Sequence, residues 1–202
     1  MKNLFDLAVS EFIRVDITLF RSGLHEQTLV SRLAYHLQNL LPPEIENYFV
    51  DVEYNRAHGG VQKFQALGEN RVFVDLVLHG RGQNGNRENI ICSEVKKRDC
   101  KATWAGPIDA ANFIFPNVQQ DGEDRQKLLI DQNKLISFTG NGDAHNPQGV
   151  VQGYELGVLL VPRYHNYTRN GIKLAKIPQV FLRYYRNGNY IIAEDRIINI
   201  NI

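Results

Sequence analysis

The sequence has few cysteines and no long apolar run. Cys92 and Cys100 are its two cysteines, and they do not form a CxxC pair. A disulfide-stabilised fold and a cysteine-based zinc site are therefore not expected. No stretch of about 18 apolar residues and no signal-peptide pattern occurs. These absences predict a cytoplasmic protein that does not enter a membrane.

An excess of charge of either sign is also missing. Lys and Arg number 23 against 22 Asp and Glu, so the net charge is +1. This balance gives no global signal for nucleic acid, although a local basic groove is compatible with it. The six histidines lack HxH or HxxxH spacing, and neither a GxSxG elbow nor a GK[ST] phosphate loop is present. We therefore do not expect a histidine metal site, a serine hydrolase or a P-loop nucleotide-binding protein.

The order of the predicted elements indicates an α/β fold. Apolar positions at helical spacing and runs of β-forming residues predict the elements. They are helices at 4–20 and 25–41, strands at 48–56, 71–79 and 89–97, a helix at 124–138, a strand at 154–162 and a final hairpin. Asn187 and Gly188 favour a type I′ turn in that hairpin. We expect a single domain over 1–202, with a mixed central sheet flanked by helices.

The apolar residues of the first and third helices predict which faces they bury. For the helix at 4–20, the stripe is Leu4, Leu7, Ala8, Phe12 and Val15. For the helix at 124–138, it is Leu128, Leu129, Leu135 and Ile136. Residues 99–122 show no clear periodicity and predict an irregular excursion.

Three charges interrupt the second and third predicted strands. Asp75 lies within an otherwise apolar run from Val72 to Leu78, while Glu94 and Lys96 close a run that begins at Ile90. The loop centred on 84–85 favours an antiparallel hairpin that pairs 79 with 90, 77 with 92 and 75 with 94. Opposed residues have Cβ atoms about 5 Å apart. The predicted register therefore places Asp75 beside Glu94, with Lys96 one step further along the same face.

Two neighbouring carboxylates in an apolar setting need compensating positive charge. Lys96 supplies one such charge, and a divalent cation would supply two more. Carboxylate oxygens are hard ligands that suit Mg²⁺ or Mn²⁺. A cation at this place, beside a lysine, could bind and polarise a phosphate group. Asp75, Glu94 and Lys96 are thus the candidate catalytic residues.

The segments V-D75-L and S-E94-V-K96-K resemble the motif of the PD-(D/E)xK nuclease superfamily. The resemblance covers about 25–161, where the predicted order α-β-β-β-α-β is that of the family's core; the N-terminal helix and C-terminal hairpin would be extensions. Val74 stands where the family often has proline. The resemblance implies a restriction-endonuclease-like fold and metal-dependent cleavage of phosphodiester bonds in DNA.

The resemblance also implies roles for individual residues. Asp75 and Glu94 would bind Mg²⁺ or Mn²⁺ together with the Val95 carbonyl, and Lys96 would position or help deprotonate the attacking water. Glu26 would either complete the metal site or hold the groups around it, but a glutamate in the first turn of a helix also favours the helix dipole. Double-strand cutting would favour a homodimer.

Further basic residues are candidates for contact with nucleic acid. Lys127, Asp131 and Lys134 lie at i, i+4 and i+7 of the predicted helix, so they form one polar face. This face would either meet a phosphate backbone or be solvated. Lys97, which follows the candidate lysine, is a third candidate for such contact.

Two other classes of function fit the same residues. One is a catalytically inactive module of nuclease fold that binds nucleic acid or protein. The other is a globular protein in which Asp75, Glu94 and Lys96 form an internal ion-pair network.

Overall fold

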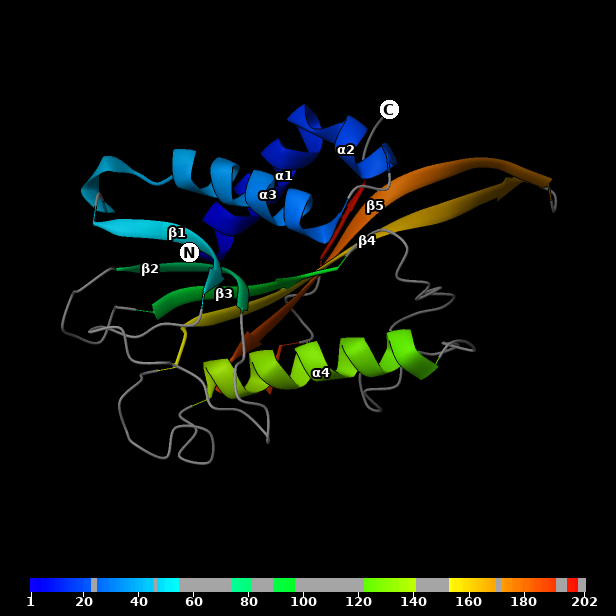
Figure 1. Cartoon of the computed structure of the whole chain (residues 1–202). Helices are drawn as coiled ribbons and strands as arrows, with labels where there is room; N and C mark the ends of the chain where they lie inside the picture. The colour runs from blue at the N-terminus through cyan, green and yellow to red at the C-terminus, as the bar shows by residue number, and fades with distance from the viewer. Residues whose placement is uncertain are drawn as a thin grey trace.

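A mixed sheet separates two layers of helices in the structure, which is a computed structural model (Figure 1). It describes residues 1–22, 25–45, 47–54, 74–80, 89–96, 122–140, 153–169, 172–191 and 196–199. One face of the sheet carries α1 (Lys2–Val15), α2 (Ile17–Ser22) and α3 (Glu26–Asn39), and the other face carries α4 (Gly122–Thr139). A short 3₁₀ turn, η1 (Pro43–Ile45), follows α3.

Within the described ranges, the sheet has seven strands in the order β1-β2-β3-β4-β5-β6, with β7 also paired to β5. Their bounds are β1 Tyr48–Tyr54, β2 Val74–Gly80, β3 Asn89–Val95, β4 Leu156–Arg169, β5 Ile172–Arg186, β6 Asn189–Tyr190 and β7 Arg196–Asn199. All neighbours are antiparallel except β3 and β4. A parallel pair needs a crossover connection, and α4 lies in the connection between these two strands. The predicted α/β class with a mixed sheet is confirmed.

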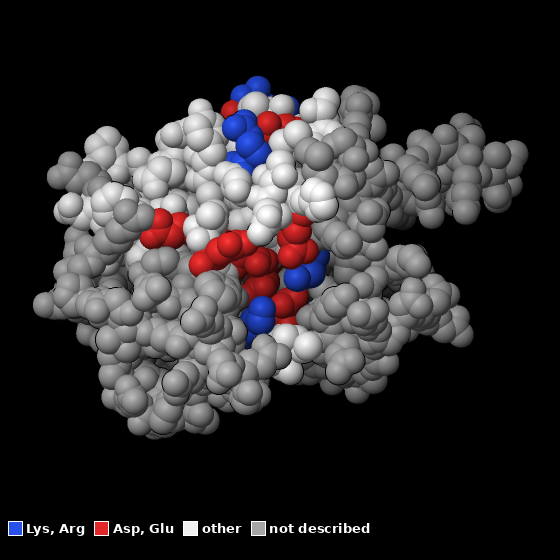
Figure 2. All heavy atoms as spheres, in the orientation of Figure 1, with Lys and Arg blue, Asp and Glu red and all other residues white. Residues whose placement is uncertain are grey.

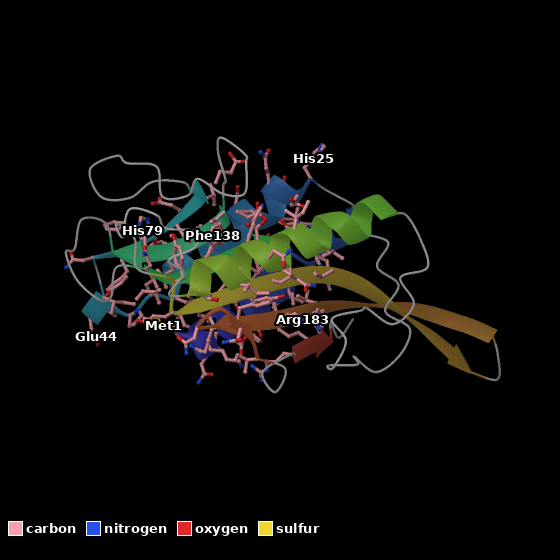
Figure 3. All side chains as sticks on the ribbon, turned by 90° about the horizontal axis from the view of Figure 1, so that it is seen from below. Met1, His25, Glu44, His79, Phe138 and Arg183 are labelled. Carbon is pink, nitrogen blue, oxygen red and sulfur yellow. The ribbon has the colours of Figure 1, made fainter. Side chains whose placement is uncertain are left out.

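Each face of the sheet has its own apolar core. The alternation of side chains along a strand sends Leu76 and Leu78 of β2 to the cluster that contains α1 and α3. Val77 of β2 and Cys92 of β3 instead join Leu128 and its neighbours on α4. Figure 3, viewed from the α4 side, shows this helix lying over the strands. The strands between the two layers are therefore buried on both faces, which explains their nearly continuous apolar sequences.

The first helix differs from its prediction in both length and phase. The helical stretch at 4–20 breaks at Asp16 into α1 and α2. Leu7 and Val15, which were predicted to be buried, are exposed, whereas Phe5, Val9 and Ile13 pack into the core. The buried stripe thus lies on a neighbouring side of the helix. Apolar residues occur on more than one side of this helix, and tertiary packing decides which of them are buried.

The later elements follow the predictions more closely. Leu128 and Leu135 of α4 are buried, as their spacing predicted. The final turn has positive φ at both Asn187 (50°) and Gly188 (71°), as a type I′ turn requires. The strand predicted at 154–162 continues as β4 to Arg169. Most of the predicted excursion at 99–122 lies outside the described residues. No helix within the described ranges is long and apolar enough to cross a membrane.

Candidate active site

The β2–β3 hairpin brings two acidic residues together. Val77 lies opposite Cys92 and Leu76 opposite Ser93, so the predicted pairing of 77 with 92 is confirmed. Continued by one residue, this register sets Asp75 against Glu94. The predicted pairing of 79 with 90 is wrong, because an irregularity after Leu78 pairs His79 with Asn89 instead. The irregularity lies toward the loop end of the hairpin and leaves the register at the acidic end intact.

Asp75 is held in place by the backbone of the neighbouring strand. The Val95 N–H donates a hydrogen bond of 2.8 Å to Asp75 Oδ2. Burial raises the pKa of Asp75 above its usual value, and this hydrogen bond and the nearby Lys96 oppose the increase only in part. Asp75 is therefore a fixed carboxylate whose charge is incompletely compensated.

Glu94 is almost fully buried, with 1% of its surface exposed. Lys134 of α4 points its Nζ at both carboxylate oxygens of Glu94, at 3.4 and 3.5 Å. Burial raises the pKa of Glu94 well above its usual range, and the carboxylates of Asp75 and Asp131 raise it further. The contacts between Lys134 and Glu94 are longer than strong charge-assisted hydrogen bonds, which measure about 2.7–2.9 Å. Glu94 is thus a destabilised carboxylate with loosely held compensating charge.

Lys96 links the two helical layers at the end of β3. Its Nζ lies 2.7 Å from Asp131 Oδ2 on α4 and 3.7 Å from Glu26 Oε1 at the start of α3. Burial alone would lower the pKa of Lys96, but the carboxylates of Asp131 and Glu26 outweigh burial and raise it. Lys96 is therefore an ammonium ion at neutral pH, and its position is set by both helices.

These side chains form one group, which we call the carboxylate–lysine cluster. Its members are Glu26, Asp75, Glu94, Asp131, Lys96 and Lys134. Four carboxyl groups face two ammonium groups, so a fully ionised cluster carries two uncompensated negative charges. Figure 2 shows acidic side chains gathered in the middle of one face, with basic side chains beside them. When every group is ionised, this excess of negative charge favours the approach of a cation over that of an anion.

The helix α4 contributes two members that the candidate catalytic set did not contain. Asp131 was predicted only as part of a polar helix face, yet it is 4% exposed and pairs with Lys96 and with Lys134 at 3.2 Å. The sequence did contain a signal for the burial of Asp131. This residue lies three positions after Leu128 and four before Leu135, and these spacings place all three residues on one side of the helix. Lys134 was predicted to contact nucleic acid, and its approach to Glu94 was not foreseen.

The other predicted residues differ in what the structure describes of them. Glu26 lies at the start of α3, as predicted, and is close enough to Lys96 to belong to the cluster. Val95 takes part through its N–H, while its side chain packs into the core on the α3 side. Lys97 lies outside the described residues, and Lys127 is described only as a position in α4.

The cluster has the chemistry, though not yet the arrangement, of a divalent-cation site. Across the described residues, no three His, Cys, Asp or Glu side chains converge as a set of metal ligands. Asp75 and Glu94 nevertheless offer hard carboxylate oxygens in a partly dry setting, which suits Mg²⁺ or Mn²⁺. The Lys134 ammonium lies against both oxygens of Glu94, where a cation bound by that carboxylate would lie. The carboxylate oxygens of Asp75 and Glu94 are therefore suitable donors for the cation that the family resemblance implies, but the described side chains do not form a set of ligands around one position.

The burial of Glu94 has a measurable consequence for stability. A carboxyl group whose pKa is raised on folding binds its proton more tightly in the native state, so its contribution favours folding at low pH. That contribution is lost as pH rises from the unfolded value of about 4.5 toward the raised native value. In EDTA, we expect the free energy of unfolding of the wild type to fall relative to that of Glu94→Gln over this range. Urea unfolding at several pH values measures the difference, and parallel curves would contradict it.

Comparison with known proteins leaves the family resemblance as an expectation. No protein-family model, curated protein or solved structure matches this chain.

Proposed function

We propose that the protein is a metal-dependent nuclease that hydrolyses phosphodiester bonds in DNA. The observation that carries the proposal is the placement of Asp75, Glu94 and Lys96 side by side at one end of the β2–β3 hairpin. The order α3-β1-β2-β3-α4-β4 of the described elements is the order that the resemblance implies. The spacing of the motif and the arrangement of the elements support the same function.

Asp75 and Glu94 are the residues that would hold Mg²⁺ or Mn²⁺, together with the Val95 carbonyl. When bound, the ion would polarise a phosphate oxygen and lower the pKa of a water molecule. The protein's own contribution is to fix Asp75 through the Val95 N–H and to bury Glu94, so that both carboxylates are pre-positioned. A preformed site of this kind needs little reorganisation during reaction.

Lys96 acts as a hydrogen-bond donor and a fixed positive charge. Because the surrounding carboxylates raise its pKa, Lys96 keeps its proton at neutral pH in the metal-free protein. Its ammonium group would orient the attacking water and stabilise the negative charge that develops on the phosphate. Asp131 and Glu26 hold this ammonium from two sides and act as positioning residues.

The proposal is tested by incubating the protein with plasmid, linear and single-stranded DNA in Mg²⁺, in Mn²⁺ and in EDTA. We expect cleavage in the presence of metal, none in EDTA, and a loss of about 10²-fold or more in Asp75→Asn. Isothermal calorimetry of the wild type and of Asp75→Asn should show a divalent-cation site that is present in the wild type and absent from the variant. Absence of cleavage with every metal, or equal cleavage by Asp75→Asn, would overturn the proposal.

A binding module without catalysis is the second candidate. The contact between Lys134 and Glu94 favours it, because this lysine already supplies charge to the carboxylate that would bind metal. In that case calorimetry should detect no cation at the site, while DNA or a protein partner still binds. Detection of a cation bound through Asp75 and Glu94 would count against the binding module and favour the nuclease.

A further inference from the structure

The strands β4 and β5 continue well beyond the rest of the sheet. The β3–β4 pairing ends with Val95 opposite Leu160, and β7 pairs β5 no nearer to the tip than Gln179. The β4–β5 pairing nevertheless continues to Arg169 opposite Ile172. Among the described strands, residues 163–169 and 172–178 thus pair only with each other. Figures 1 and 3 both show this two-stranded end lying beyond the helices. We call these two strand ends, residues 163–169 and 172–179, the ribbon.

The ribbon concentrates positive charge in a protein whose net charge is only +1. Its charged residues are Arg163, Arg169, Lys173 and Lys176, and it contains no Asp or Glu. Acidic residues are absent from the whole stretch 156–193. An isolated two-stranded ribbon is marginally stable in water, and four like charges repel one another. A negatively charged partner would relieve that repulsion.

The ribbon begins close to the carboxylate–lysine cluster. Because β3 and β4 are parallel, Glu94 lies level with Leu159, and the Lys96 N–H donates to the Leu160 carbonyl at 2.9 Å. Arg163 follows Leu160 by three residues, a rise of about 10 Å, and the ribbon extends about 20 Å further. One turn of B-DNA measures about 34 Å. A duplex at the cluster can therefore reach the ribbon within one turn.

We propose that the ribbon is the arm by which this protein holds double-stranded DNA next to the cluster. A two-stranded β-ribbon fits the major groove of B-DNA, and its basic residues can contact the flanking phosphates. This inference rests on the proposed nuclease function for the identity of the partner. It assigns affinity to the ribbon and hydrolysis to the cluster, so the two can be measured apart.

Equilibrium binding in EDTA tests the arm without cleavage. Fluorescence anisotropy with a labelled duplex of about 30 base pairs, which spans about three turns, gives the dissociation constant at several salt concentrations. We expect Lys173→Gln/Lys176→Gln to weaken binding about tenfold at 0.1 M salt and to reduce the salt slope by about 2. The conservative Lys173→Arg/Lys176→Arg variant should keep wild-type affinity.

The matched control removes the same charge from another element, α1. Lys2→Gln/Arg14→Gln alters two basic residues of α1, and we expect it to change affinity less than about twofold. Equal effects of the two double variants, or no binding of the duplex by the wild type, would overturn the arm. Dimerisation in sedimentation that depends on Lys173 and Lys176, without an effect on DNA affinity, would also overturn it, because the ribbon would then pair with a second copy.

The outcomes separate the arm from the proposed catalysis. Cleavage that does not depend on the ribbon supports the proposed nuclease activity and contradicts the proposed role of the ribbon as a DNA-binding arm. Ribbon-dependent binding of duplex DNA without cleavage in any metal supports the DNA-binding arm and contradicts the proposed nuclease activity. Circular dichroism and thermal melting of each variant show whether a loss of binding is a loss of fold.

Discussion

Lys96→Met should reduce metal-dependent DNA cleavage by about 10²- to 10⁴-fold while leaving the protein folded. The substitution keeps the length and apolar stem of the side chain but removes the ammonium that Asp131 and Glu26 hold in place. If this ammonium stabilises the developing phosphate charge, its loss acts on kcat more than on DNA binding. Single-turnover cleavage with the protein in excess measures the rate, and anisotropy in EDTA measures the affinity.

Two variants make this result interpretable. Lys2→Met removes a lysine of similar exposure that pairs with Asp6 on α1, and it should cleave DNA at the wild-type rate. Lys96→Arg keeps the charge but changes the shape and reach of the donor, and we expect an intermediate rate. Cleavage by Lys96→Met within threefold of the wild type would rule out a catalytic ammonium at this position.

Local sequence patterns predicted the fold where one signal dominated. The two prolines after α3 predicted where that helix ends. Asn187 and Gly188 predicted the tight turn, and the positive φ angles at both residues agree with it. The phase of α1 was missed, because apolar residues such as Leu7 and Phe5 lie on different sides of the helix and packing chooses between them. The length of β4 was missed because its extension past Pro162 is polar and basic, unlike a buried strand.

The candidate site was predictable only along the hairpin. Asp75 and Glu94 could be paired because alternation and loop length constrain an antiparallel register, and that register holds at Val77 and Cys92. Asp131 reaches the cluster through the packing of α4 on the sheet. The apolar stripe of α4 indicates which side of the helix faces the sheet, but no local rule fixes where along the sheet the helix lies. Helical spacing could place Asp131 and Lys134 near one another, but only the tertiary structure could place them at Lys96 and Glu94.

Lys134→Met should bind Mg²⁺ at least about tenfold more tightly than the wild type. The Lys134 ammonium lies 3.4 and 3.5 Å from the two oxygens of Glu94, so a divalent cation bound there must displace it or be repelled by it. Two unit charges at about 4 Å interact by about 4 kcal/mol at an effective dielectric of about 20. Recovery of about a third of that energy corresponds to a tenfold gain in affinity. Isothermal calorimetry at neutral pH measures the dissociation constant directly.

The comparison with Lys2→Met separates this local competition from a general change in net charge. Both variants lose one positive charge, but Lys2 pairs with Asp6 at 3.1 Å, and Asp6 is not a member of the cluster. An equal gain in both variants would mean that Lys134 exerts no specific effect on the cation. If the wild type binds no Mg²⁺ and Lys134→Met does, the lysine is the internal counter-ion of Glu94. Metal binding in the native protein would then require Lys134 to move toward Asp131, its second partner at 3.2 Å.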